Sequence, residues 1–128
     1  MNENQIANRV IGAAIDVHRT LGPGLLENSY EQCLTYKIRQ LGFDVEQQKP
    51  VPIVYEEIHL ECGYRLDMVV SGKLVIEVKS VEALHDIHFA QTLTYMKFGG
   101  YRLGLLINFN VLLLKDGIRR VINGQLLD

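Results

Sequence analysis

Residues 65–79, which read RLDMVVSGKLVIEVK, contain the pattern that decides the fold. The Ser71-Gly72 pair is typical of a tight hairpin turn, and both flanking runs are rich in apolar and β-branched residues. We therefore predict two antiparallel strands, His59 to Val70 and Lys73 to Val81. Asp67 and Glu77 lie four and five residues from the turn, so the pairing makes them near neighbours across the ladder.

Strand alternation assigns the side chains of both strands to two faces. The core face of the second strand carries Leu74, Ile76 and Val78, and its other face carries Val75, Glu77 and Lys79. In the first strand, the corresponding sets are Leu66, Met68 and Val70 on one face and Arg65, Asp67 and Val69 on the other. The pattern thus predicts two carboxylates and an ammonium group on one side of the hairpin.

This group of charges has two interpretations. Adjacent carboxylates repel unless a cation lies between them, and hard oxygen ligands select Mg²⁺ or Mn²⁺. Lys79 could then position a water molecule or contact a phosphate, which is the chemistry of phosphodiester hydrolysis. The alternative is an exposed ion pair, such as Glu77 with Arg65, because acid-x-Lys triplets are common and surface pairs are frequent.

The rest of the chain predicts an α/β fold, a mixed central β-sheet flanked by α-helices. Apolar spacing indicates helices over Ile6–Leu21, Leu26–Leu41 and Ile87–Phe98, which end near glycines. Further extended segments are expected at Phe43–Tyr55 and Leu103–Phe109, and the segment 73–109 should form a parallel crossover. A closing hairpin is predicted from Val111–Lys115 and Ile118–Ile122 around Asp116-Gly117. No linker or repeat divides residues 1–128, so we expect a single domain.

Composition excludes several classes of protein. The 128 residues are 48% hydrophobic and 22% charged, with a net charge of -2, which is typical of a globular domain and not of a strongly basic nucleic-acid-binding module. Cys33 and Cys62 lack metal-site spacing, and we expect two buried free thiols. Because the sequence has neither a signal peptide nor an apolar run long enough to cross a bilayer, we expect a cytoplasmic protein.

Four motifs in order resemble those of a known family. Asp67 followed by Glu77-Val78-Lys79 resembles the PD-(D/E)xK nuclease signature, and residues 24–30 read G-x-x-E-x-x-Y. Residues 87–95 contain a Q-x-x-x-Y element, and residues 104–109 resemble the late strand of the family. The chain therefore resembles the GxxExxY proteins, a branch of the PD-(D/E)xK nuclease superfamily, over about residues 6–121. The resemblance implies a restriction-endonuclease-like core, although Leu66 replaces the proline that names the motif.

The resemblance also implies roles for individual residues. It makes Asp67, Glu77 and Glu27 the ligands of Mg²⁺ or Mn²⁺, and Lys79 the catalytic lysine. Residues expected to meet the substrate are Gln91, Tyr95, Arg65 and His88. Simpler interpretations stay open: Glu27 could favour a helix N-terminus, Gln91 could be solvated, and His88 could cap or pack near the site. The spacing of His85 and His88 is weak support for zinc, since no third ligand follows. Tyr30 is expected in the core, and His18 is expected to pack or bond a turn carbonyl.

Three functions follow as hypotheses. The first is a metal-dependent nuclease that acts on DNA. The second is a non-catalytic module with the same fold that binds nucleic acid or protein. The third is a homodimer formed through a helix or an edge strand, which is compatible with either of the others.

Overall fold

A computed structural model describes residues 1–124 and residue 126. It contains one five-stranded mixed sheet in the order β1-β2-β3-β4-β5, in which only β3 and β4 run parallel. The strands are β1 (Val45–Tyr55), β2 (Ile58–Val70), β3 (Leu74–Lys79), β4 (Leu103–Asn108) and β5 (Ile118–Ile122). The helices are α1 (Glu3–Leu21), α2 (Glu27–Gln40) and α3 (Asp86–Gly99), with a short 3-10 helix at Leu114–Gly117. The predicted α/β architecture is confirmed.

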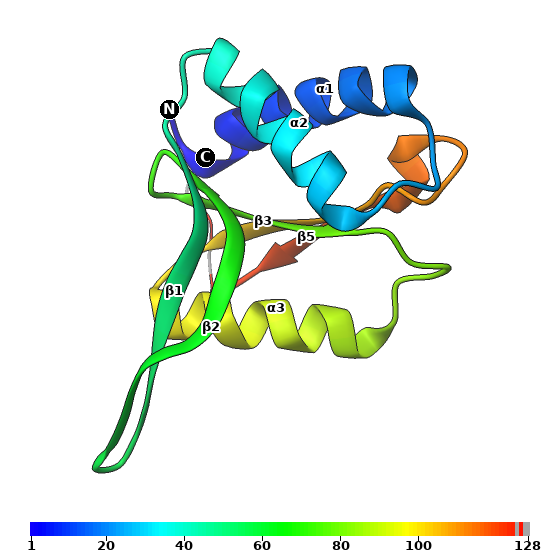
Figure 1. Ribbon diagram of the computed structural model, residues 1–128. Coiled ribbons are helices and arrows are strands. Elements are labelled where there is room, and N and C mark those ends of the chain that lie inside the picture. Colours follow the sequence, from blue (N-terminus) through cyan, green and yellow to red (C-terminus); the bar gives the residue numbers. More distant parts are fainter. Residues whose placement is uncertain (125, 127–128) are drawn as a thin grey trace.

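Helices cover both faces of the sheet: α1 and α2 lie on one face and α3 lies on the other (Figure 1). The two layers have separate cores. The larger core joins α1 and α2 to side chains of the central strands that include Met68, Val70, Leu74, Ile76 and Val78. The smaller core lies beneath α3 and includes Val51, Leu66, Val69, Val75, Met96 and Leu106. The central strands are buried on both faces, so any polar side chain in them must find a partner or a bound ion.

Local signals fix the ends of the elements. The side chain of Asn2 accepts the N–H of Gln5 at 2.9 Å, while the side chain of Gln5 accepts the N–H of Asn2 at 2.9 Å, so a capping box starts α1. The β2–β3 turn has φ values of 53° at Ser71 and 66° at Gly72, and two positive values in succession are typical of a type I′ hairpin turn. Its closing bond runs from the N–H of Lys73 to the Val70 carbonyl at 3.0 Å. The predicted hairpin is therefore confirmed.

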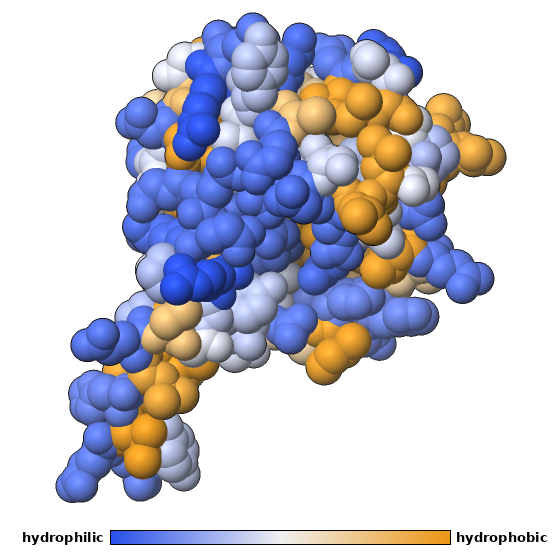
Figure 2. Space-filling model, in the orientation of Figure 1, coloured by the Kyte–Doolittle hydropathy of each residue, from blue (hydrophilic) through white to orange (hydrophobic). Residues whose placement is uncertain are grey.

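The far ends of β1 and β2 form a hairpin arm that extends beyond the body of the molecule (Figure 1). We define the arm as residues 52–62. Apolar side chains are exposed along it (Figure 2), and the large exposed ones are Val54, Tyr55, Ile58 and Leu60. A two-stranded ribbon that packs on nothing is marginally stable in water. The arm is therefore a surface that a partner could cover.

Alternation along β1 and β2 breaks at one step, contrary to the prediction. Met68 packs in the larger core, but Leu66, which was expected on the same face, packs in the smaller core. The same change occurs in β1, where Val45 belongs to the larger core and Val51 to the smaller one. Both strands therefore change the face that they bury between these positions, where the two-stranded ribbon twists.

Two other predictions were wrong. Residues 111–113 form no strand, and the predicted arm Val111–Lys115 ends in the 3-10 helix, so β5 pairs with β4 instead of forming a terminal hairpin. Gly117 packs tightly against the main chain, because a Cβ atom there would meet the Asn108 oxygen at 2.1 Å. Cys33 and Cys62 are free but exposed, not buried. Among the described residues, no helix has the length and apolar character needed to cross a membrane.

Candidate active site

Asp67 and Glu77 meet where β2 and β3 separate. The last ladder pair beside them is Met68 with Ile76, which puts Asp67 opposite Glu77 one step farther from the turn. Asp67 Oδ2 accepts the N–H of Val78 at 2.8 Å, so its carboxylate lies between the two strands. Burial and, after it, the negative charge of Asp67 raise the pKa of Glu77, as expected where two carboxyl groups face each other. The structure thus brings together the two acidic residues that the hairpin pattern predicts as neighbours.

Glu77 is the most perturbed group of the site. It is 2% exposed, and burial is the largest cause that raises its pKa to about 9, followed by the charge of Asp67. Its Oε2 receives a long hydrogen bond of 3.5 Å from the Tyr64 hydroxyl, whereas its buried Oε1 has no hydrogen-bond partner. A buried carboxylate oxygen without a partner is costly unless a proton or a cation binds it.

Lys79 follows Glu77 by two residues on β3 and is half-buried. Its positive charge lowers the pKa of Glu77, so the two side chains interact electrostatically. The alternative of a surface pair between Glu77 and Arg65 is excluded, since Glu77 is buried. Arg65 is exposed and donates to the main-chain oxygen of Gln48 at 3.3 Å.

Glu27 lies near the pair but is not gathered with it. As the first residue of α2, it accepts the N–H of Ser80 at 3.2 Å, one residue beyond Lys79. The Ser80 hydroxyl in turn donates to the Leu25 carbonyl at 2.6 Å. Within residues 1–124 and 126, no three His, Cys, Asp or Glu side chains lie close enough together to hold a metal ion. Glu27 therefore reaches the end of β3 without joining Asp67 and Glu77 in one cluster.

The predicted substrate residues of α3 have different surroundings. Tyr95 stacks on Tyr64 with ring centroids 3.9 Å apart, and Tyr64 contacts Glu77, so Tyr95 borders the site through that ring. Gln91 is exposed one turn before Tyr95. Nδ1 of His88 accepts the N–H of His85 at 3.0 Å, which caps the start of α3. His88 therefore acts as a cap, one of the alternatives left open by the sequence.

The sequence-based predictions for Tyr30, in the first turn of α2, and for His18, on α1, are confirmed. The ring of Tyr30 is fully buried and stacks on Phe109 with centroids 4.5 Å apart. Its hydroxyl donates to the Gly22 carbonyl and accepts the N–H of Leu25. His18 Nε2 lies 3.1 Å and 2.8 Å from the carbonyl oxygens of Phe109 and Val111. Because carbonyls only accept, this nitrogen carries the proton.

Two buried polar residues were missed by the sequence analysis. Glu31 is 5% exposed and accepts side-chain amides of Gln47 and Gln48, each at 2.9 Å. It lies one helical turn after Glu27, a spacing that could have indicated a second inward carboxylate. Asn108 is the one polar side chain in the buried strand β4, and it both accepts the N–H of Val81 and donates to the Val81 carbonyl. It thereby fixes the segment that follows β3.

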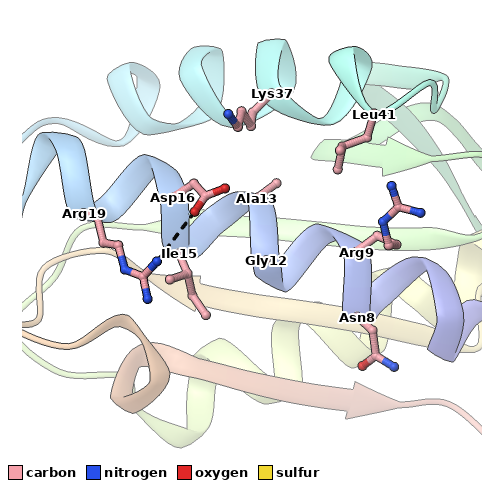
Figure 3. Close-up of a pocket in the computed structure, with 9 residues that line it drawn as sticks. All are labelled: Asn8, Arg9, Gly12, Ala13, Ile15, Asp16, Arg19, Lys37 and Leu41. Atoms are coloured by element: carbon pink, nitrogen blue, oxygen red, sulfur yellow. Dashed lines mark ion pairs between the residues drawn. The ribbon is translucent and has the colours of Figure 1, made fainter.

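A separate groove of about 440 Å³ lies between α1 and α2 (Figure 3). Its lining includes three cations, Arg9, Arg19 and Lys37, and one carboxylate, Asp16. Figure 3 shows Arg19 paired with Asp16, at an N–O distance of 3.8 Å, with Lys37 reaching in from the opposite helix. None of the predicted catalytic residues lines this groove, so it is not the predicted active site.

The carboxylate pair fits a small hard cation. Mg²⁺ commonly binds through one or two carboxylates and keeps several waters, so a third protein carboxylate is not required. The unpartnered Oε1 of Glu77 and the Asp67 carboxylate are ligands of the right kind, and a cation would offset the burial and the repulsion that raise the pKa of Glu77.

A family model described as the PD-(D/E)XK nuclease superfamily matches residues 4–121. No curated protein and no solved structure gives a match. Nucleases of this superfamily generally use divalent metals and act on nucleic acid. The match covers nearly all of the sheet and of the three helices, and so the chain belongs to the PD-(D/E)XK nuclease superfamily.

Proposed function

We propose that this protein is a metal-dependent nuclease that hydrolyses phosphodiester bonds in DNA. One observation carries the proposal: the buried Glu77 faces Asp67 across the hairpin, and one of its carboxylate oxygens has no hydrogen-bond partner. Asp67, Glu77 and Lys79 lie inside the matched segment, and their spacing resembles the superfamily motif. Buried groups with strongly shifted pKa values in such an arrangement are typical of functional sites.

Each residue of the motif has a proposed role. Asp67 and Glu77 hold Mg²⁺ or Mn²⁺, which when bound supplies Lewis-acid polarisation of the scissile phosphate. Lys79 orients the attacking water or contacts the phosphate, a role supported by its electrostatic interaction with Glu77. Glu27 assists through water molecules, since its carboxylate lies at the end of β3. The proposed substrate contacts are Arg65, Gln91, Tyr95 and His88.

We also propose that the chain belongs to the GxxExxY branch and acts in the cytoplasm. Support for the branch comes from residues 24–30. The tyrosine of that segment anchors the turn before α2 through its hydroxyl, and the glutamate accepts a main-chain N–H next to the catalytic strand. The two named residues of the motif thus connect the start of α2 to the site.

Cleavage assays test the proposal. Single- and double-stranded DNA are incubated with Mg²⁺ or Mn²⁺ and the wild type, Asp67→Asn, Lys79→Ala or the control Glu61→Gln, which changes an exposed carboxylate of the arm. We expect the two site variants to lose at least about a hundredfold in rate and the control to keep its activity. Equal rates for wild type and both site variants, or no cleavage of any DNA by the wild type, would refute the nuclease.

A non-catalytic module that binds nucleic acid or protein is the second candidate. It is favoured by the net charge of -2, which gives the domain no excess of basic residues. Calorimetric titration with Mn²⁺ separates the candidates, because only the nuclease requires the ion to bind at Asp67 and Glu77. A homodimer is compatible with both functions, and the exposed apolar side chains of the arm are the surface that supports it. Light scattering measures that state.

A further inference from the structure

The β1–β2 ladder is interrupted beside Asp67. Gln47 pairs with Met68 and Lys49 pairs with Leu66, whereas Gln48 and Asp67, which face each other between these pairs, form no ladder pair. Asp67 also has no ladder partner on β3. Its position is therefore not set by regular pairing on either side. This is the same step at which both strands change the face that they bury.

The interruption coincides with an unusual backbone conformation. Gln48 has a φ of 51°, in the left-handed region that residues other than glycine rarely adopt. A glutamine keeps this conformation only when its surroundings hold it there. The sequence offers no turn signal at this position, so the cause must come from a tertiary contact.

Glu31 supplies that contact from α2. One of its carboxylate oxygens accepts the side-chain amide of Gln47, and the other accepts that of Gln48, both at 2.9 Å. The two amides come from consecutive residues, which normally point to opposite sides of a strand. A single buried carboxylate can accept both only if the backbone turns between them. Glu31 therefore fits the twisted conformation and not a regular strand.

Asp67 benefits directly from the twist. Asp67, which has no ladder pair on either side, accepts the N–H of Val78 through its side chain at 2.8 Å. That bond holds the carboxylate beside Glu77. We propose that Glu31 is a positioning residue for Asp67: it acts through Gln47 and Gln48 to hold the left-handed turn that places the Asp67 carboxylate at the site. Its importance for metal binding rests on the proposed function, but its effect on Asp67 does not.

The hydrogen exchange rate of the Val78 amide tests this role without metal or substrate. It is compared with the rate for Leu105, in the middle of β4, so that a general loss of stability cancels. We expect Glu31→Ala to raise the Val78 rate relative to Leu105 by about tenfold, the factor that corresponds to one lost hydrogen bond. The matched control, Glu61→Ala, removes an exposed carboxylate and should leave the ratio unchanged.

A rescue variant distinguishes positioning from simple support of the fold. Glycine adopts positive φ without steric cost, so adding Gln48→Gly to Glu31→Ala should return the Val78 ratio most of the way to its wild-type value. Mn²⁺ affinity, measured by calorimetry, should fall in Glu31→Ala and recover in the double variant. The proposal would be overturned if Glu31→Ala left the ratio of the Val78 and Leu105 rates unchanged, even with faster exchange at both sites. It would also be overturned if Gln48→Gly gave no rescue. If the exchange ratios of the variants are as expected but the wild type binds no Mn²⁺, Glu31 is still the positioning residue for Asp67. The proposed nuclease function is then the part that is overturned.

Discussion

Metal binding by the carboxylate pair should release a proton, because the raised pKa of Glu77 keeps it protonated at neutral pH. Its pKa of about 9 lies two units above pH 7, so only about one molecule in a hundred carries an ionised Glu77 before the ion binds. A cation binds the ionised form, and the proton must leave. We therefore expect Mn²⁺ affinity to rise by about tenfold per pH unit between about pH 6 and pH 8.

Calorimetry in pairs of buffers with different ionisation enthalpies measures both quantities. At pH 7, the wild type should release about one proton for each Mn²⁺ bound. Glu77→Gln keeps the shape of the side chain but has no proton to release, so it should bind more weakly and show no proton release. The control Glu61→Gln should match the wild type. Affinity that is constant over this pH range, with no proton released, would refute the reasoning that burial keeps Glu77 neutral until a cation arrives.

Three further predictions concern stability, measured by urea denaturation without divalent ions. The pKa of Glu77 in the folded protein lies above its unfolded value of about 4.5, so the stability that neutral Glu77 contributes is fully present below pH 4.5 and is lost as the pH rises toward 9. Glu77→Gln should therefore gain stability relative to the wild type between about pH 5 and pH 9, and parallel pH profiles of the two proteins would contradict this. Tyr30→Phe leaves two main-chain groups without their hydrogen-bond partner and should lower the free energy of unfolding by about 1–2 kcal/mol. Tyr36→Phe, on the exposed side of the same helix, should lower it by less than about 0.5 kcal/mol, and equal losses would show that the buried hydroxyl has no structural role. Asn108→Ala removes two hydrogen bonds to Val81, in the segment after β3, and should lower the free energy of unfolding by about 1–3 kcal/mol. Asn110→Ala removes one bond to Val81 and should lower it less, and the reverse order would show that Asn108 is not the main anchor of this segment.

Local sequence patterns were sufficient for most of the fold. The Ser71-Gly72 turn fixed the register of β2 and β3, and from that register the meeting of Asp67 and Glu77 follows by counting. The three helices begin and end within a few residues of their expected limits, since apolar periodicity and terminal glycines are local features. The parallel pairing of β3 with β4 also agrees with the expected crossover around α3.

Tertiary contacts explain what the sequence did not predict. Alternation fails at Leu66, next to the step where Gln48 adopts a positive φ, and no local turn motif marks that step. Glu31, the partner of Gln48, lies on α2, 17 residues earlier, and looks like any polar residue of a helix. The arm Val111–Lys115 is apolar enough for a strand, but Gly117 packs against the Asn108 carbonyl and the chain forms a 3-10 turn instead. Such outcomes depend on which surfaces meet, and a pattern of single residues does not contain that information.

Diffraction from a crystal grown with Mn²⁺, with data collected near the manganese absorption edge, tests the central claim most directly. We expect an anomalous peak within bonding distance of both Asp67 and Glu77, with Glu77 Oε1 as one ligand. A crystal that shows no peak at these carboxylates, or shows manganese only in the groove between α1 and α2, would contradict the assignment of this pair as the metal site.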